Sequence, residues 1–166
     1  MNAENPTPSA PATPVPPATI LPASVTALLH SEIPLTQAMG MTVAKWDGTT
    51  VTLAAPLAPN QNHADTAWGG TISSMGIMAG YCLIYLLLEE RKISNRLLIQ
   101  KSSIDYLRPI DADLTATACL PDPTALAEFV DSLTRRRRAR LTLNSQVHCQ
   151  RMLAATHTGL YIAMLY

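Results

Sequence analysis

Apolar and polar residues alternate along much of the chain, which is the pattern of strands that bury one face and expose the other. The alternation is clearest near the C-terminus, where Leu141, Leu143 and Val147 share one face and the alternate positions from 140 to 148 are polar. Asp47-Gly48 lies between the first two such segments, and this dipeptide is typical of hairpin turns. Six segments are therefore predicted to form strands, with antiparallel pairing and one covered face: 41–46, 50–55, 97–107, 113–120, 139–149 and 152–165.

A long apolar run interrupts this pattern and predicts a central helix. No proline occurs from about 66 to 92, and residues 72–88 carry no charge. A helix that is apolar on most sides must be buried nearly all round, so we expect the sheet to wrap it. The 17 uncharged residues are at the short limit of a membrane span and include serines and glycines, so a core helix is favoured over a transmembrane one. Ser73, Gly76 and Gly80 recur at helical spacing, and this stripe of small residues is expected to let another backbone approach closely.

Two shorter helices complete the predicted elements. Ser24 is in position to cap a helix that runs through about His30 and ends before Pro34. The segment 124–135 has the spacing of an amphipathic helix. A hairpin, a long helix and four strands with one helical insertion together predict an α+β domain.

The first 22 residues differ in composition from the rest of the chain. Seven of the 13 prolines fall there, among Ala, Thr, Ser and Asn. Proline removes a backbone donor and small side chains bury little surface, so residues 1–22 are predicted to form a disordered tail and residues 23–166 the folded domain. The segment has neither the basic start nor the continuous apolar run of a secretory signal. A polyproline ligand is an alternative role for it.

Charge and cysteine content exclude several classes of function. Lysine plus arginine and aspartate plus glutamate both count 12, so no net field draws the protein to nucleic acid or to an acidic membrane. Only 14% of the residues are charged and 48% are hydrophobic, which favours surface hidden in an oligomer. Three cysteines without a Cys-x-x-Cys pair exclude a disulfide framework and a zinc ribbon, and they indicate a reducing, cytoplasmic setting.

One basic run stands out, consisting of Arg135–Arg138 and Arg140. Its guanidinium groups suit a phosphate, for instance the nucleotide end of a coenzyme. They equally suit a solvated helix end, where cations interact favourably with the helix dipole. The run is too short and too poor in aromatic residues to indicate nucleic-acid binding.

The densest polar cluster, residues 60–71, comes directly before the long helix. A helix start presents unpaired N–H groups and a partial positive charge, and Gly69-Gly70 would let a ligand carbonyl approach them. Such amides can stabilise an oxyanion in acyl transfer. In that reaction His63 or Asp65 would activate water, and Asn62 would orient a carbonyl or a water molecule.

Plainer roles compete with each of these assignments. Asp65 or Thr66 is equally suited to cap the helix. A lone histidine in a loop usually faces solvent, which is the plainer role for His63. The two glycines would otherwise serve close packing, although ligand approach is favoured for them. His148 and His157 fall in predicted strands without a third ligand at metal spacing. Structural roles are therefore favoured for these two histidines, and no metal site is expected.

The block Asn60-x-Asn62-His63-x-x-Thr66-x-Trp68-Gly69-Gly70-Thr71 before a long helix resembles the hotdog-fold thioesterases. It is most similar to the thioesterase domain at the C-terminus of YiiD-type proteins. Four further motifs agree in order along residues 24–166: Ile33-Pro34-Leu35-x-x-Ala38-Met39-Gly40, Ala55-Pro56-Leu57-x-Pro59-Asn60, Ile104-x-Tyr106-Leu107-Arg108-Pro109-Ile110 and Arg138-Ala139-Arg140-Leu141. The resemblance implies a hotdog fold, in which a curved antiparallel sheet wraps the long helix. It also implies a homodimer or a dimer of dimers, with active sites at the subunit boundary.

The resemblance further implies a function. It implies hydrolysis of acyl thioesters of coenzyme A or acyl carrier protein without a cofactor, with a glycine amide polarising the thioester carbonyl. The candidate catalytic residues are then Asp65, His63 and Asn62. The candidate substrate-binding residues belong to the glycine block and its surroundings: Gly69, Gly70, Thr71, Trp68, Asn60 and Arg108.

One position departs from the pattern of the related phenylacetate-pathway thioesterases. Those enzymes carry a catalytic acid inside the helix, about two turns after the glycines. Here that neighbourhood is Met75-Gly76-Ile77-Met78, which contains no acid. A catalytic base must then come from Asp65 or His63 in the loop or from a second subunit. A non-catalytic module that binds acyl groups or acyl carriers is the alternative function.

Overall fold

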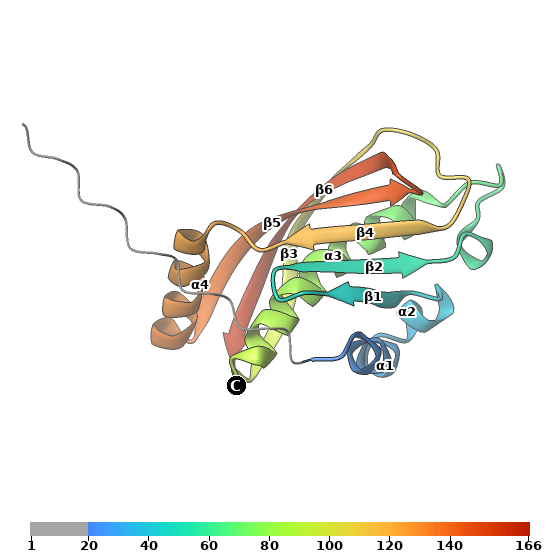
Figure 1. The fold of residues 1–166 in the computed structure, drawn as a ribbon. Helices are drawn as coiled ribbons and strands as arrows, with labels where there is room; N and C mark the ends of the chain where they lie inside the picture. The colour runs from blue at the N-terminus through green and yellow to red at the C-terminus, as the bar shows by residue number, and fades with distance from the viewer. Residues whose placement is uncertain (1–19) are drawn as a thin grey trace, which may run out of the picture.

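The computed structural model describes residues 20–166, and the predictions of a disordered tail and of a polyproline ligand fall mainly on residues outside this range. One six-stranded antiparallel sheet, ordered β1-β2-β4-β5-β6-β3, curves around a long helix, α3 (Gly69–Glu90) (Figure 1). The predicted α+β class is confirmed, and each strand lies within two residues of its predicted bounds. The strands are β1 Thr42–Trp46, β2 Thr50–Ala55, β3 Asn95–Tyr106, β4 Leu114–Cys119, β5 Arg138–Cys149 and β6 Met152–Leu165.

Two helices precede the sheet. α1 spans Pro22–Glu32 and so begins inside the stretch predicted as tail. The predicted Ser24 cap is wrong, because Leu21 occupies the N-cap position and the Ser24 hydroxyl donates to the Leu21 carbonyl (2.7 Å). A short helix that the pattern did not predict, α2 (Pro34–Ala38), follows. Proline suits the first turn of both helices, because its missing N–H would have no partner there.

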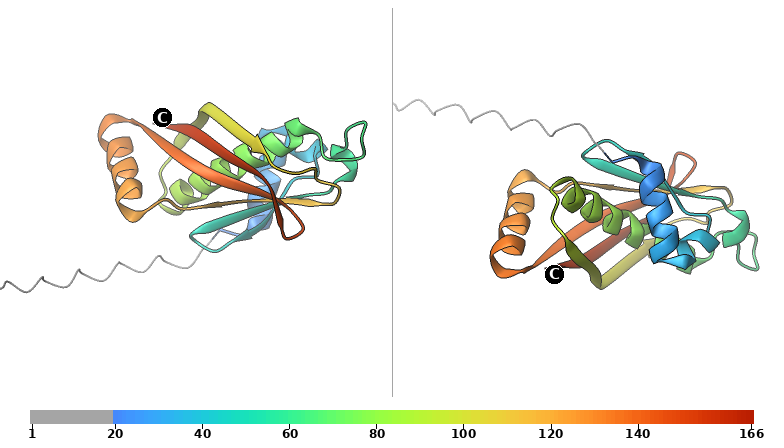
Figure 2. Two further views of the ribbon diagram at one scale, coloured as in Figure 1. Left: turned by 90° about the horizontal axis from the view of Figure 1, so that it is seen from above. Right: turned by 90° about the horizontal axis from the view of Figure 1, so that it is seen from below.

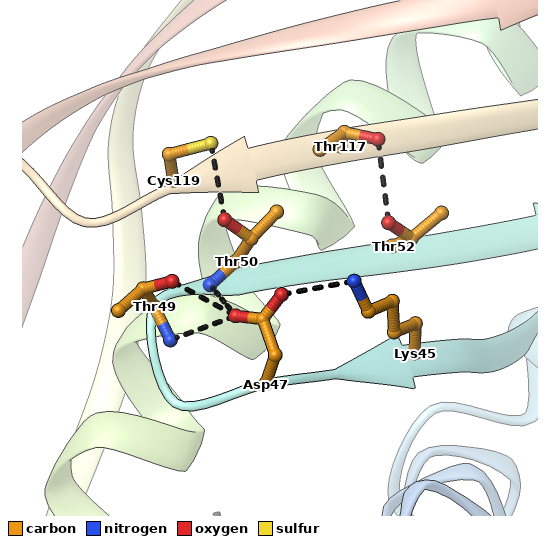
Figure 3. Close-up of polar contacts among 7 residues, drawn as sticks. All are labelled: Lys45, Asp47, Thr49, Thr50, Thr52, Thr117 and Cys119. Carbon is orange, nitrogen blue, oxygen red and sulfur yellow. Dashed lines mark hydrogen bonds and ion pairs between the residues drawn. The ribbon is translucent and has the colours of Figure 1, made fainter. Parts of the chain in front are cut away.

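β1 and β2 form the predicted hairpin, and one carboxylate holds the turn (Figure 3). Asp47 Oδ1 accepts hydrogen bonds from Thr49 N–H (3.1 Å), Thr49 Oγ1 (2.8 Å) and Thr50 N–H (2.8 Å). Asp47 Oδ2 forms an ion pair with Lys45 (3.0 Å). The bond from the Thr49 hydroxyl, and then the contact with Lys45, hold the pKa of the Asp47 carboxyl well below its ordinary value. Gly48 takes a left-handed φ of 91°, which its missing Cβ allows.

The central helix α3 is wrapped by the curved sheet (Figure 2). By length and composition it would qualify as a membrane span, yet 72% of its most apolar stretch is buried within the protein, as in a core helix. Met75 and Leu83 are fully buried. Burial also raises the pKa of the Cys82 thiol to about 12, so this thiol stays protonated. At the C-terminal end of α3, Trp46 Nε1 donates to Glu90 (2.8 Å) and ties the helix to β1.

The small residues of α3 face β6. A Cβ added at Gly76 would lie 2.7 Å from the Cβ of His157, and one at Gly80 would lie 2.3 Å from the hydroxyl of Tyr161. The Tyr161 hydroxyl also donates to the carbonyl of Ile77 (2.8 Å). Side chains of β6, rather than the predicted backbone, therefore occupy the space that the glycines leave.

β5 alternates between buried and exposed residues along nearly its whole length, as predicted. Its buried face includes Ser145 beside Leu143 and Val147. The amphipathic helix α4 (Pro123–Arg136) precedes β5 and buries Phe129 and Leu133. Its core face is thus apolar, and its exposed face carries the charged residues.

Candidate functional site

Asn60 ties the loop before α3 to the body of the protein. It ends a 3-10 turn, Ala58–Asn60, and is buried. Its Nδ2 donates to the carbonyls of Met39 (2.8 Å) and Pro56 (2.7 Å). Its Oδ1 accepts from the hydroxyl of Thr71 (3.1 Å) in the first turn of α3. Asn60 and Thr71 therefore hold the loop against the helix start.

Asn62 organises the turn that carries His63 and Asp65. Its Oδ1 accepts from the Ala64 N–H (2.8 Å), and its Nδ2 donates to the Thr66 hydroxyl (3.0 Å). The Asp65 N–H donates to the Asn62 carbonyl (3.3 Å), with Asp65 at a left-handed φ of 58°. Aspartate tolerates this conformation better than most residues do. The side chains of His63 and Asp65 are exposed on the outside of this turn.

The start of α3 has no side-chain cap. Trp68 is its N-cap, so neither Asp65 nor Thr66 takes the capping role that was open to them. The Ile72 N–H donates to the Trp68 carbonyl (3.1 Å). Within residues 20–166, no acceptor pairs with the N–H groups of the three preceding residues, Gly69, Gly70 and Thr71. Three free donors therefore lie at the positive end of the helix dipole.

Two aromatic side chains lie next to these donors. The ring of Trp68 lies against Gly70, where an added Cβ would come within 2.3 Å of it. The Tyr106 hydroxyl, at the end of β3, donates to the Gly69 carbonyl (3.0 Å). Trp68 is 63% exposed, Tyr106 54% and Leu107 52%. Gly69 and Gly70 are half-buried and Thr71 is buried, so the amides of the two glycines are the free donors that lie beside the exposed apolar side chains.

Tyr106 is a further candidate site residue, which was not among those predicted from the sequence. The signal for it was its place in the Ile104–Ile110 motif, near the end of a predicted strand. Arg108 lies two residues further on, with its side chain exposed and its N–H donating to the Ala154 carbonyl (3.1 Å). The Ala67 N–H donates to the Ile110 carbonyl (2.8 Å), which joins the loop after β3 to the loop before α3. The structure thus brings the loop of Arg108 beside the helix start.

The family model described as putative thioesterase (yiiD C-terminal) matches residues 23–165. The chain belongs to this family. The hotdog fold and the resemblance to YiiD-type thioesterase domains are thereby confirmed. Family membership supports a thioesterase-type function.

Solved structures agree with this fold. A protein of unknown function from Chlorobaculum tepidum TLS is similar, with 25% identity, a TM-score of 0.82 and coverage of 87% of this chain and 94% of that chain. A putative thioesterase from Shewanella oneidensis has 24% identity, a TM-score of 0.79 and coverage of 86% and 96%. A Pseudomonas aeruginosa protein described as a probable thioesterase has 19% identity, a TM-score of 0.75 and coverage of 90% and 99%.

The interior of the helix in this YiiD-type domain offers no acid at Met75–Met78, as the sequence indicated. Polar groups reach this neighbourhood from the sheet instead. The Ser145 hydroxyl donates to the Gly76 carbonyl (2.7 Å), and the imidazole of His157 lies beside it. Burial lowers the pKa of His157, so the imidazole is neutral at neutral pH. Within residues 20–166, no group of three or more His, Cys, Asp or Glu side chains is arranged to hold a metal ion.

The basic run of this YiiD-type domain lies at the end of α4 and the start of β5. Arg135 pairs with Asp131 (2.7 Å), and Arg140 Nε donates to Gln100 Oε1 (3.0 Å). Arg136 and Arg138 line a groove of about 480 Å³. Arg135 and Arg136 lie in the last turn of α4, where cations suit the dipole. Both roles considered for this run remain compatible with its position.

Proposed function

We propose that this protein hydrolyses acyl thioesters at the N-terminus of α3. The observation that carries the proposal is the pair of free N–H groups of Gly69 and Gly70, which are half-buried and lie beside exposed apolar side chains. Donors fixed at a helix start stabilise an oxyanion without reorganising during the reaction. An acyl chain laid against Trp68 and Tyr106 would bring its carbonyl oxygen to these amides.

The reaction follows from this placement. Water attacks the thioester carbonyl carbon while His63 or Asp65 accepts its proton, and the Gly69 and Gly70 amides stabilise the oxyanion. The carbon–sulfur bond then breaks, and the proton passes to the leaving sulfur. Asn62 positions the turn that carries both candidate bases, since its side chain bonds within the turn.

The remaining site residues bind and position the substrate. Asn60 and Thr71 fix the helix start through their mutual hydrogen bond. The exposed guanidinium of Arg108 suits a phosphate of the carrier, whether coenzyme A or acyl carrier protein. No cofactor is required by this chemistry.

We also propose that the protein works as a homodimer or a dimer of dimers in the cytoplasm. The exposed side chains of Trp68, Tyr106 and Leu107 are the surface that a second copy would cover, which would complete the acyl site. The cysteines Cys82, Cys119 and Cys149 are all free thiols, which suits a reducing compartment.

Release of free thiol from a panel of acyl-CoA thioesters tests the proposal. Asp65→Asn removes one candidate base and keeps a residue that tolerates a left-handed φ. His63→Gln removes the other candidate base. We expect one of the two variants to lose at least about 100-fold in kcat, because general-base catalysis contributes that much. Glu128→Gln on the exposed face of α4 is the matched control and should keep full turnover.

A non-catalytic acyl-binding module is the second candidate function. The helix interior at Met75–Met78 favours it, because no acid is present there. Saturable binding of an acyl-CoA without thiol release would support the binding module and overturn the hydrolase. Thiol release that both base variants leave unchanged would remove His63 and Asp65 from the mechanism.

A further inference from the structure

Three polar side chains that the proposed function does not use are joined by hydrogen bonds across neighbouring strands, and we call them the serine–histidine series. Ser145 on β5 and His157 on β6 are opposite one another in register and are 2% and 1% exposed. Ser145 Oγ lies 3.1 Å from His157 Nδ1, and Ser102 Oγ on β3 lies 2.9 Å from His157 Nε2. Ser102 is exposed, on the strand at the edge of the sheet. The serine–histidine series therefore runs from the core to the surface.

One hydrogen bond to a backbone carbonyl fixes which atom donates in each bond of the serine–histidine series. The Ser145 hydroxyl donates its only proton to the Gly76 carbonyl (2.7 Å), because a carbonyl can only accept. Ser145 Oγ must then accept from His157, so Nδ1 carries the imidazole proton. His157 Nε2 is left without a proton and accepts from the Ser102 hydroxyl. A hydroxyl, a base and a group that orients the base are thus arranged as in an activated nucleophile.

The surroundings of His157 keep it available as a base. Ser102 from β3, Ser145 from β5 and Gly76 from α3 contact it, and none of the three is charged. Burial alone lowers its pKa, so Nε2 stays unprotonated at neutral pH.

The serine–histidine series is separate from the free amides of Gly69 and Gly70. Gly76, which contacts His157, follows Gly69 by seven residues, and a helix rises about 1.5 Å per residue, so the two sites lie roughly 10 Å apart along α3. One carbonyl carbon cannot meet both Ser102 and the free amides of the helix start. Chemistry at the serine–histidine series therefore does not depend on the thioesterase mechanism proposed above.

We propose that Ser102 is the nucleophile of a second acyl-transfer site that accepts small carboxylic esters, with His157 as its general base and Ser145 as a positioning residue. Ser102 Oγ bonds to the ester carbonyl carbon while its proton passes to His157 Nε2. The ester carbon–oxygen bond breaks, and the imidazolium gives the proton to the leaving oxygen. Water then attacks acyl-Ser102, its proton moves through His157 to Ser102 Oγ, and the carboxylic acid leaves.

Covalent labelling of the full chain tests this proposal. The probes are p-nitrophenyl acetate, followed by nitrophenol release, and a fluorophosphonate, whose adduct is located by peptide mass spectrometry. We expect the adduct on Ser102 and its loss in Ser102→Ala. Ser103→Ala, which changes the neighbouring exposed serine, is the matched control and should be labelled like the native chain. His157→Gln should slow labelling at least about 100-fold.

The role of Ser145 has its own readout. Ser145→Ala removes the acceptor that fixes Nδ1, so it should slow labelling and move the pH profile of the labelling rate. A side chain that only packs would leave that profile in place. Absence of any adduct on Ser102 in the folded native chain overturns the proposal. An adduct that forms equally fast in His157→Gln also overturns it. Neither probe is a thioester, so failure here is distinguishable from failure of the thiol-release assay.

Discussion

Asn60 and Asn62 are identical side chains two positions apart that have different structural roles. Asn60 is buried and forms hydrogen bonds with two carbonyls and one hydroxyl, so it fixes the loop to the helix start. Asn62 is half-buried and bonds within its own turn. The left-handed backbone of Asp65 completes that turn. In the proposed mechanism the two asparagines therefore position the loop, and His63, Asp65 and the helix amides are the groups that would act on the substrate.

The amide of Gly69 can be removed without removing the helix. Gly69 is the first residue of α3, where proline is well tolerated, and Trp68 before it is already extended (φ −63°, ψ 140°). Gly69→Pro deletes one N–H donor, whereas Gly69→Ala keeps it. If this donor stabilises the oxyanion, Gly69→Pro should lower kcat for thiol release by about 100-fold or more, and Gly69→Ala should change it little.

Circular dichroism of both variants checks that α3 is intact. Equal turnover in Gly69→Pro and Gly69→Ala would assign the oxyanion to other donors.

At the scale of elements, α3 and β6 pack closely because two glycines of α3 face large side chains of β6. Gly76 and Gly80 leave room that His157 and Tyr161 fill, and the Tyr161 hydroxyl bonds to a helix carbonyl. Large side chains on a strand can then lie close to the helix axis. The stripe of small residues thus serves packing within one chain, against side chains of the sheet.

Gly76→Ala should destabilise the protein although alanine favours helices. The added Cβ would lie 2.7 Å from the Cβ of His157, which cannot swing away because it is attached directly to the β6 backbone. Overpacking of this kind costs about 1–3 kcal/mol, and alanine gains roughly 1 kcal/mol over glycine within a helix. We expect a net loss of up to about 2 kcal/mol in the free energy of unfolding, measured by urea denaturation.

Gly69→Ala is the matched comparison for this change. Its Cβ would lie 3.5 Å from the Tyr106 hydroxyl, an ordinary contact, so its stability should equal or slightly exceed that of the native protein. A Gly76→Ala variant as stable as Gly69→Ala would contradict the close packing of α3 on β6.

At the scale of the whole molecule, one buried histidine joins the main parts of the fold. His157 bonds to β3 through Ser102 and to β5 through Ser145, which in turn bonds to α3. Burial lowers its pKa below the ordinary value of 6.5. Below pH 6.5 the unfolded chain therefore takes up a proton at this residue that the folded chain does not. Stability is consequently expected to fall as the pH drops below that value.

Urea denaturation at pH 7.5 and pH 5.5 measures this linkage. One proton contributes at most about 1.4 kcal/mol per pH unit, so the native protein should lose about 1 kcal/mol at the lower pH. His157→Gln should lose much less over the same interval. His63→Gln, at an exposed loop position, should behave like the native protein. An unchanged pH dependence in His157→Gln would contradict a neutral buried His157.

The sequence alone determined the order of the main elements. Alternation with a period of two marks strands, the uncharged run 72–88 marks the core helix, and Asp47-Gly48 marks the hairpin, because each signal comes from neighbours along the chain. The polar block 60–71 likewise predicts where the site lies. The extra helix α2 and the cap of α1 were not predicted. Pro22 was assigned to the end of the tail and Pro34 to the end of a helix, whereas each of these prolines begins a helix.

Only the tertiary structure decided which side chains meet. Tyr106 reaches Gly69 across 37 residues, and Ser102 reaches His157 across 55, so no local spacing relates them. The same folding gives Asn60 its buried partners at Met39 and Pro56. Local patterns record which face of an element is buried, whereas contacts between elements depend on strand order and register, which arise when the sheet closes around the helix.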